Sequence, residues 1–135
     1  MRGKPRAIKR LYDWPGRVTC VSVIDGDTIR AVFDQGFDTE HKERRLRLAG
    51  IDSREMRGGT AATREQAQAA KARMEELLPP GTVFSARTEP DPEKYGGYLG
   101  FIVLADGTNV NALMLAESLA QPYAGGARAS AEPPS

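Results

Sequence analysis

The chain has 135 residues, of which 27% are charged, and a formal net charge of +1 at pH 7. This length fits a single domain with its own hydrophobic core, and the near-neutral balance excludes a strong positive field over the whole protein. The single cysteine, Cys20, excludes an internal disulfide and, among apolar neighbours, predicts a buried thiol. No apolar stretch is long enough to span a bilayer and no signal-like segment is visible, so we expect a cytoplasmic protein; a secreted form already stripped of its signal would give the same pattern.

The N-terminal half begins with a basic segment and continues with strands. Residues 1–15 carry five basic side chains in their first ten positions and are expected to form an arm, which serves either as solubilising charge or as a phosphate contact. Segments of β-branched or alternating apolar residues predict three strands, at residues 18–24, 28–33 and 45–48. Asp25-Gly26 is the expected hairpin turn between the first two strands.

The C-terminal half alternates helices and strands. Thr63 to Gln66 matches a capping box, which predicts a helix that ends before Pro79. Two further strands are expected at residues 82–85 and 98–104, and Asn111 is the expected cap of a second helix that runs to Leu119. Residues 124–135 are small, polar and proline-rich, which indicates a disordered tail.

The order of these elements predicts the fold class. Five short strands with a helix between the third and fourth are typical of an OB-type barrel. We therefore expect a mainly β, α+β domain over residues 16–123, built from a five-stranded barrel with two or three helices.

Two acidic motifs stand at neighbouring strand ends. They are Asp25-Gly26-Asp27-Thr28, between the first two strands, and Asp52-Ser53-Arg54-Glu55, after the third. Hard divalent cations prefer several oxygen ligands, so two carboxylates and a backbone carbonyl would form an open metal site. The alternative is that both motifs are ordinary turns and loop caps. A calcium loop of the EF-hand type is excluded, because its twelfth position would be Gly36 instead of glutamate.

Several stretches together resemble the staphylococcal nuclease (thermonuclease) family. They are residues 23–30, 45–55, 93–100, 106–111 and 118–120. The resemblance runs from about residue 17 to residue 123, and it implies a calcium-dependent phosphodiesterase that acts on DNA and RNA.

The resemblance also implies roles for particular residues. By motif position, Asp27 and Asp52 are metal carboxylates, and Ser53 offers its backbone carbonyl to the same ion. Glu55 matches the proposed general base and Arg47 the first phosphate-binding arginine. Lys94 and Tyr95 match residues beside the bound phosphate. These types suit phosphodiester hydrolysis, which needs an activated water and neutralisation of the phosphoryl charge.

The chain departs from the family pattern at one important position. Gly97 stands where the family usually has a second phosphate arginine, and the loss of one such donor typically costs about 10²–10³ in rate. Arg54 or Arg57 is a candidate substitute and substrate-binding residue, or both are solvent-facing charges. On this basis we expect Gly97→Arg to raise the rate.

Three functions follow from these observations. The first is a slowed metal-dependent endonuclease, a monomer that acts on single-stranded nucleic acid more readily than on duplex and binds no membrane. The second is a nucleic-acid-binding barrel with little catalysis. The third is a protein-interaction domain, which the retained carboxylates disfavour.

Overall fold

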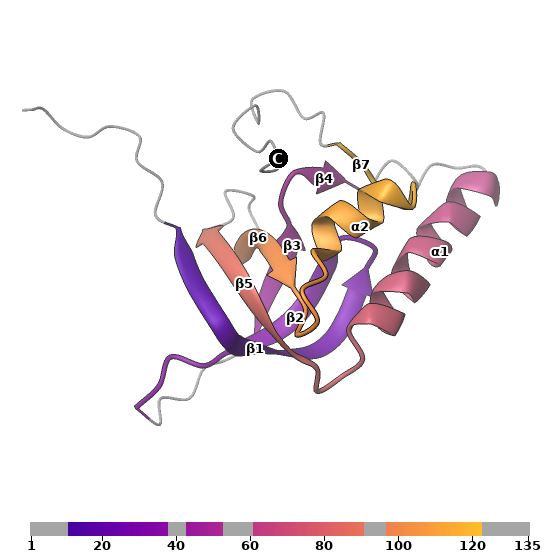
Figure 1. Ribbon diagram of the computed structural model, residues 1–135. Coiled ribbons are helices and arrows are strands. Elements are labelled where there is room, and N and C mark those ends of the chain that lie inside the picture. Colours follow the sequence, from indigo (N-terminus) through magenta and orange to yellow (C-terminus); the bar gives the residue numbers. More distant parts are fainter. Residues whose placement is uncertain (1–10, 38–42, 53–60, 91–96, 123–135) are drawn as a thin grey trace, which may run out of the picture.

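The computed structural model describes residues 11–37, 43–52, 61–90 and 97–122. In chain order the elements are β1 (Tyr12–Asp25), β2 (Thr28–Phe33), β3 (Arg44–Leu48), β4 (Ile51–Asp52), α1 (Ala61–Leu77), β5 (Val83–Pro90), β6 (Tyr98–Val103), α2 (Val110–Ala116) and β7 (Gln121–Pro122). Figure 1 shows the larger strands gathered on one side, with both helices on the other.

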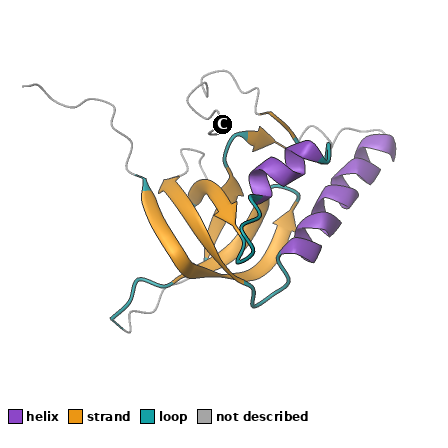
Figure 2. Cartoon of the chain, in the orientation of Figure 1, coloured by secondary structure: helices purple, strands orange, loops and turns teal. Residues whose placement is uncertain are grey.

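Five of the strands close into a barrel in the order β1-β2-β3-β6-β5. The pairing of β3 with β6 is parallel and the other four pairings are antiparallel. The long strand β1 closes the barrel because it pairs with β2 along one edge and with β5 along the other, bending at irregularities in both pairings. The predicted five-stranded barrel, with a helix between its third and fourth strands, is confirmed (Figure 2).

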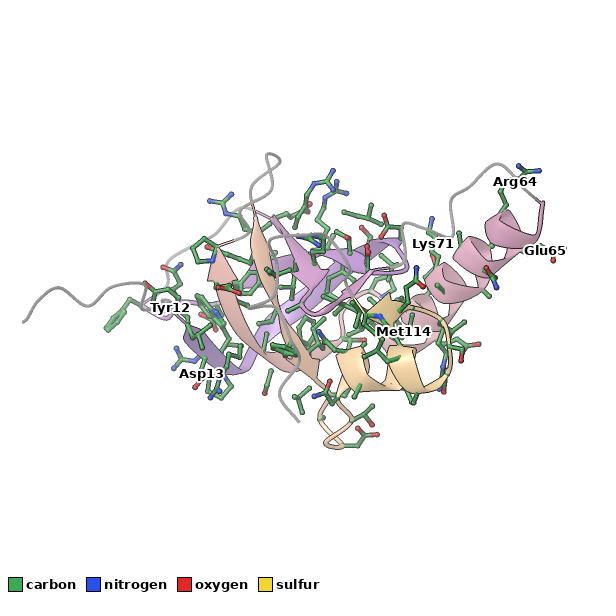
Figure 3. The ribbon with its side chains drawn as sticks, turned by 90° about the horizontal axis from the view of Figure 1, so that it is seen from above. Tyr12, Asp13, Arg64, Glu65, Lys71 and Met114 are labelled. Atoms are coloured by element: carbon green, nitrogen blue, oxygen red, sulfur yellow. The ribbon has the colours of Figure 1, made fainter. Side chains whose placement is uncertain are left out.

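The core lies inside the barrel and beneath the two helices. Side chains with at most 2% exposure come from every part of the domain: Val18, Ile29, Phe33, Leu46, Leu48, Met74, Leu78, Phe84, Ile102, Val110 and Met114. Each such side chain contributes about 1.5–3 kcal/mol on burial. Ala70 and Met74 on α1, and Leu78 just after its end, recur at four-residue spacing and share the buried face, whereas Arg64 and Glu65 project into solvent at the far end of the helix (Figure 3).

An aromatic group fills the end of the barrel opposite the β1–β2 turn. Phe33 makes edge-to-face contacts with Trp14 and Tyr98, each with ring centroids 5.0 Å apart. The indole Nε1 of Trp14 donates a hydrogen bond of 2.9 Å to Oγ1 of Thr88, which is itself 1% exposed. Residues of β1, β2, β5 and β6 are thereby joined across the barrel.

Strand β1 is longer than the sequence pattern predicted. It begins at Tyr12, within the segment 1–15 that the sequence assigned to an arm, and Tyr12, Asp13 and Trp14 pair with β5. The mixed polarity of these residues hid the strand, because Trp14 faces inward whereas Asp13 is exposed and bonds to Arg87. Residues 1–10 and 124–135 lie outside the described residues.

Both residues predicted as helix caps, Thr63 and Asn111, lie inside their helices. Helix α1 begins at Ala61, so Thr63 lies inside the helix instead of capping it. Helix α2 is capped by Asn109, whose side chain accepts a hydrogen bond from the backbone of Ala112, and it ends at Ala116. Asn111 is a buried residue of this helix with a different task, described below.

Candidate metal and phosphate site

The turn between β1 and β2 holds Asp27 in a defined position. The turn consists of Gly26 and Asp27, with Asp25 paired to Thr28 across it. The side chain of Asp25 accepts a hydrogen bond of 3.1 Å from the backbone N–H of Asp27, and the hydroxyl of Thr28 donates one of 2.9 Å to Oδ1 of Asp27. Asp27 is only 3% exposed. Because burying a carboxylate is costly without polar partners, the hydrogen bond from Thr28 helps this turn to hold its buried acid.

The same turn lies against the end of β3. The carbonyl of Asp27 accepts a hydrogen bond of 2.8 Å from the backbone N–H of Leu48, and Thr28 pairs directly with Arg47. Leu48 leads through a turn at Gly50, which has a φ of 79°, into β4 and Asp52. The fold therefore brings Asp27, Arg47 and the strand end that leads to Asp52 to one rim of the barrel.

Short contacts fix the backbone around Asp52. Strand β4 pairs with β7 through Asp52 and Gln121, a two-stranded pairing too short to leave a pattern in the sequence (Figure 1). Three residues earlier, Ala49 donates its N–H to the carbonyl of Gly100 at 2.8 Å and accepts a hydrogen bond of 2.9 Å from Nδ2 of Asn111. These contacts tie the segment between β3 and β4 to β6 and α2.

Asn111 is the residue that the sequence pattern misassigned. Its side chain is 1% exposed and makes three hydrogen bonds to backbone, at 3.1 Å to the N–H of Ile102, 2.9 Å to the carbonyl of Ala49 and 3.0 Å to the carbonyl of Gly100. Strand β3 ends opposite Gly100, so the side chain of Asn111 takes the place of a strand partner for the rest of β6. Spacing alone cannot distinguish this use of an asparagine from a helix cap.

The other predicted site residues lie outside the described residues: Ser53, Arg54, Glu55, Arg57, Lys94 and Tyr95. For Asp52 the structure describes the backbone. Over residues 11–37, 43–52, 61–90 and 97–122, no three His, Cys, Asp or Glu side chains gather as a ligand set. The donors at the described rim are carboxylate and carbonyl oxygens, which match the preference of hard divalent cations such as calcium.

Gly97 is required by the backbone. Its φ is +86°, and a Cβ added there would lie 2.7 Å from the carbonyl oxygen of Arg45. Any side chain at this position would meet the β3 backbone just where β3 begins to pair with β6. The expected gain in rate from Gly97→Arg stays an untested prediction, and the structure sets against it a disturbance of the strand that carries Arg47.

A hollow of about 420 Å³ lies elsewhere on the barrel. It is lined by residues of β1, β5, β6 and the segment before α2, among them Trp14, Arg87, Phe101 and Asn109. Of the site residues that the structure describes, neither Asp27 nor Arg47 lines it. The turn at Asp27 and this hollow are therefore separate features of the described residues.

The fold and the rim define a class, an OB-type barrel with a buried carboxylate at the first hairpin turn and an arginine beside it. The sequence model of one family, described as Staphylococcal nuclease homologue, matches residues 45–132. The chain belongs to this family. The matched region includes Arg47 and Asp52, and the structure adds Asp27, which lies outside the match but next to Arg47.

A comparison with curated proteins gave no match. Among the described residues, neither helix has the length and apolar character needed to cross a membrane.

Proposed function

We propose that this protein is a divalent-metal-dependent phosphodiesterase that hydrolyses single-stranded DNA or RNA, with calcium as the expected ion. Membership of a family of nuclease homologues supports the reaction class. The single observation that carries the proposal is the buried carboxylate of Asp27, held at the barrel rim directly beside Arg47 and the segment that leads to Asp52.

The proposed metal ligands are the carboxylates of Asp27 and Asp52 and the backbone carbonyl of Ser53. A bound cation would supply Lewis-acid neutralisation of the phosphoryl oxygens and lower the pKa of a nearby water. The hydrogen bond from Thr28 holds one oxygen of Asp27, so this ligand needs little reorganisation when an ion arrives.

The remaining roles fall to residues around this centre. Arg47 would hold a phosphate through the fork of its guanidinium, and its backbone is fixed because it belongs to strand β3. Glu55 is proposed to accept the proton of the attacking water. Lys94, Tyr95 and Arg54 are proposed substrate contacts.

A second function is favoured by one observation, the backbone at Gly97. Residue 97 is glycine, so the second phosphate arginine that the resemblance leads one to expect is missing at this position. The close contact with Arg45 also leaves no space for a side chain at residue 97. A barrel that binds nucleic acid and cuts it slowly or not at all would tolerate this backbone.

Digestion of a single-stranded DNA oligonucleotide separates the two functions. We expect cleavage with calcium, loss of cleavage with a chelator, and loss of at least 10²-fold in rate for Asp27→Asn. Asp106→Asn is the matched control, because Asp106 is an exposed acid in another Asp-Gly turn and bonds to the backbone of Thr108. Absence of cleavage with calcium, manganese and magnesium, while the oligonucleotide still binds, would establish the binding function instead.

A further inference from the structure

The outward face of β2 and β3 carries a row of cations that leads away from the rim. In the β2–β3 pairing, Thr28 lies opposite Arg47 and Arg30 lies opposite Arg45. The residues between them, Ile29 and Leu46, are fully buried and also form a pair. Since side chains alternate across a strand, Arg30, Arg45 and Arg47 share the outer face; together they are called the arginine row.

The arginine row places two like charges directly opposite each other. Like charges directly opposite on neighbouring strands are destabilising, and Arg30 and Arg45 form such a pair. Within the described residues, Glu43 offsets part of this charge through an ion pair with Arg30, with 3.5 Å between Oε1 and Nε. Both side chains are roughly half exposed, at 43% for Arg30 and 50% for Glu43, so the pair is weak and easily exchanged for another anion.

The spacing of the row suits a chain of phosphates. Successive outward positions on a strand advance by about 6.6–6.8 Å, so Arg45 and Arg30 continue the direction set by Arg47 one step further from Asp27. Each guanidinium can bind phosphate oxygens through its planar fork.

We propose that a single-stranded nucleic acid bound at the rim continues along the outer face of β2 and β3, with its next phosphates on Arg45 and Arg30. This inference rests on the proposed function for its anchor at Asp27 and Arg47. It assigns two binding residues, Arg30 and Arg45, and makes longer strands better ligands than short ones. Glu43 competes with the nucleic acid for Arg30.

Fluorescence anisotropy of a labelled oligothymidylate, in chelator so that it is not cut, tests this path. For single strands, the slope of log affinity against log salt changes by about 0.7 for each phosphate contact. We expect Arg30→Gln and Arg45→Gln each to flatten the slope by about this amount. Glu43→Gln should tighten binding at low salt, an effect that partial unfolding cannot imitate.

Arg87→Gln is the matched control. Arg87 is also an exposed strand arginine paired with one acid, Asp13, with Nε 2.7 Å from Oδ1, but it lies on β5 outside the arginine row. Its substitution removes the same charge and should leave the slope unchanged. Equal slopes in Arg30→Gln, Arg45→Gln and the unaltered protein would overturn the proposal, as would an equal loss in Arg87→Gln or unchanged affinity in Glu43→Gln.

Cleavage of a dinucleotide separates this inference from the function on which it rests. A dinucleotide occupies the rim but is too short to reach Arg30, so Arg30→Gln should leave its rate unchanged while lowering kcat/KM on long strands. Failure to cut either substrate with any metal would refute the proposed nuclease, and the salt slopes would still decide the path. Equal loss on both substrates would refute the path alone.

Discussion

Replacing Asn111 by leucine, which has the same number of side-chain heavy atoms but no polar group, tests whether this side chain holds the rim to the barrel. The substitution removes all three hydrogen bonds that join Asn111 to Ile102, Ala49 and Gly100. The carbonyl of Gly100 keeps its bond to the N–H of Ala49. The N–H of Ile102 and the carbonyl of Ala49 lose the partner that Asn111 provides.

The size of the effect follows from those two backbone groups. A buried polar group that loses its partner costs about 1–3 kcal/mol, and two of them cost about 2–6 kcal/mol. The apolar side chain of leucine gains part of this back, which leaves a net loss of about 2–4 kcal/mol in the free energy of unfolding. At this chain length 1 kcal/mol corresponds to about 4 °C, so Tm should fall by roughly 8–16 °C.

Thermal unfolding followed by circular dichroism measures this loss. Asn109→Ala is the control, because it removes the cap of the same helix and should cost about 1 kcal/mol, or roughly 4 °C. Asn111→Asp should be at least as damaging as leucine near neutral pH, because a carboxylate cannot donate to two carbonyls. A Tm for Asn111→Leu no lower than that of Asn109→Ala would refute this role.

Three further outcomes are expected. Gly97→Arg should lower Tm by at least about 4 °C without raising the cleavage rate, since its positive φ alone costs about 1–2 kcal/mol; a faster enzyme of unchanged Tm would contradict this. The hydrogen bond from Arg73 lowers the pKa of Glu117 below its ordinary 4.5. The unaltered protein should therefore have a higher Tm than Arg73→Gln above that pH, and the difference in Tm should shrink as pH falls through the lowered pKa. A difference in Tm that grew in acid would contradict the pairing. Burial raises the pKa of the Cys20 thiol to about 11, so alkylation at pH 8 should be far slower in the native protein than in denaturant, and equal rates would show that the thiol is exposed.

The barrel strands could be predicted because their side chains alternate or are densely β-branched. Strands β2, β3 and β6 lie close to their expected positions, since pairs such as Leu46 and Leu48 must face the interior. The start of β1 could not be predicted, because Trp14 faces the barrel while its neighbours bond to distant residues of β5. Long-range contacts of this kind leave no local pattern.

In the candidate site, too, local features could be predicted from the sequence, whereas long-range contacts could not. The sequence pattern predicted a hairpin turn here but placed it at Asp25-Gly26, one residue before the observed Gly26-Asp27 turn, and the closeness of Asp27 to Arg47 comes from the observed pairings. The role of Asn111 and the close contact of Gly97 with Arg45 depend on segments far apart in the chain, so only the fold reveals them. The roles of Ser53, Glu55, Lys94 and Tyr95 stay predictions from the resemblance.

Calcium binding tests the central claim most directly, namely that the rim of Asp27 and Asp52 holds a divalent ion. Thermal unfolding in increasing calcium should raise the Tm of the unaltered protein, because an ion at 100 times its Kd stabilises the folded state by about 2.7 kcal/mol. Asp27→Asn and Asp52→Asn should lose this rise, whereas Asp106→Asn should keep it. A Tm that does not respond to calcium, manganese or magnesium, or a rise that survives in both rim variants, would contradict the account.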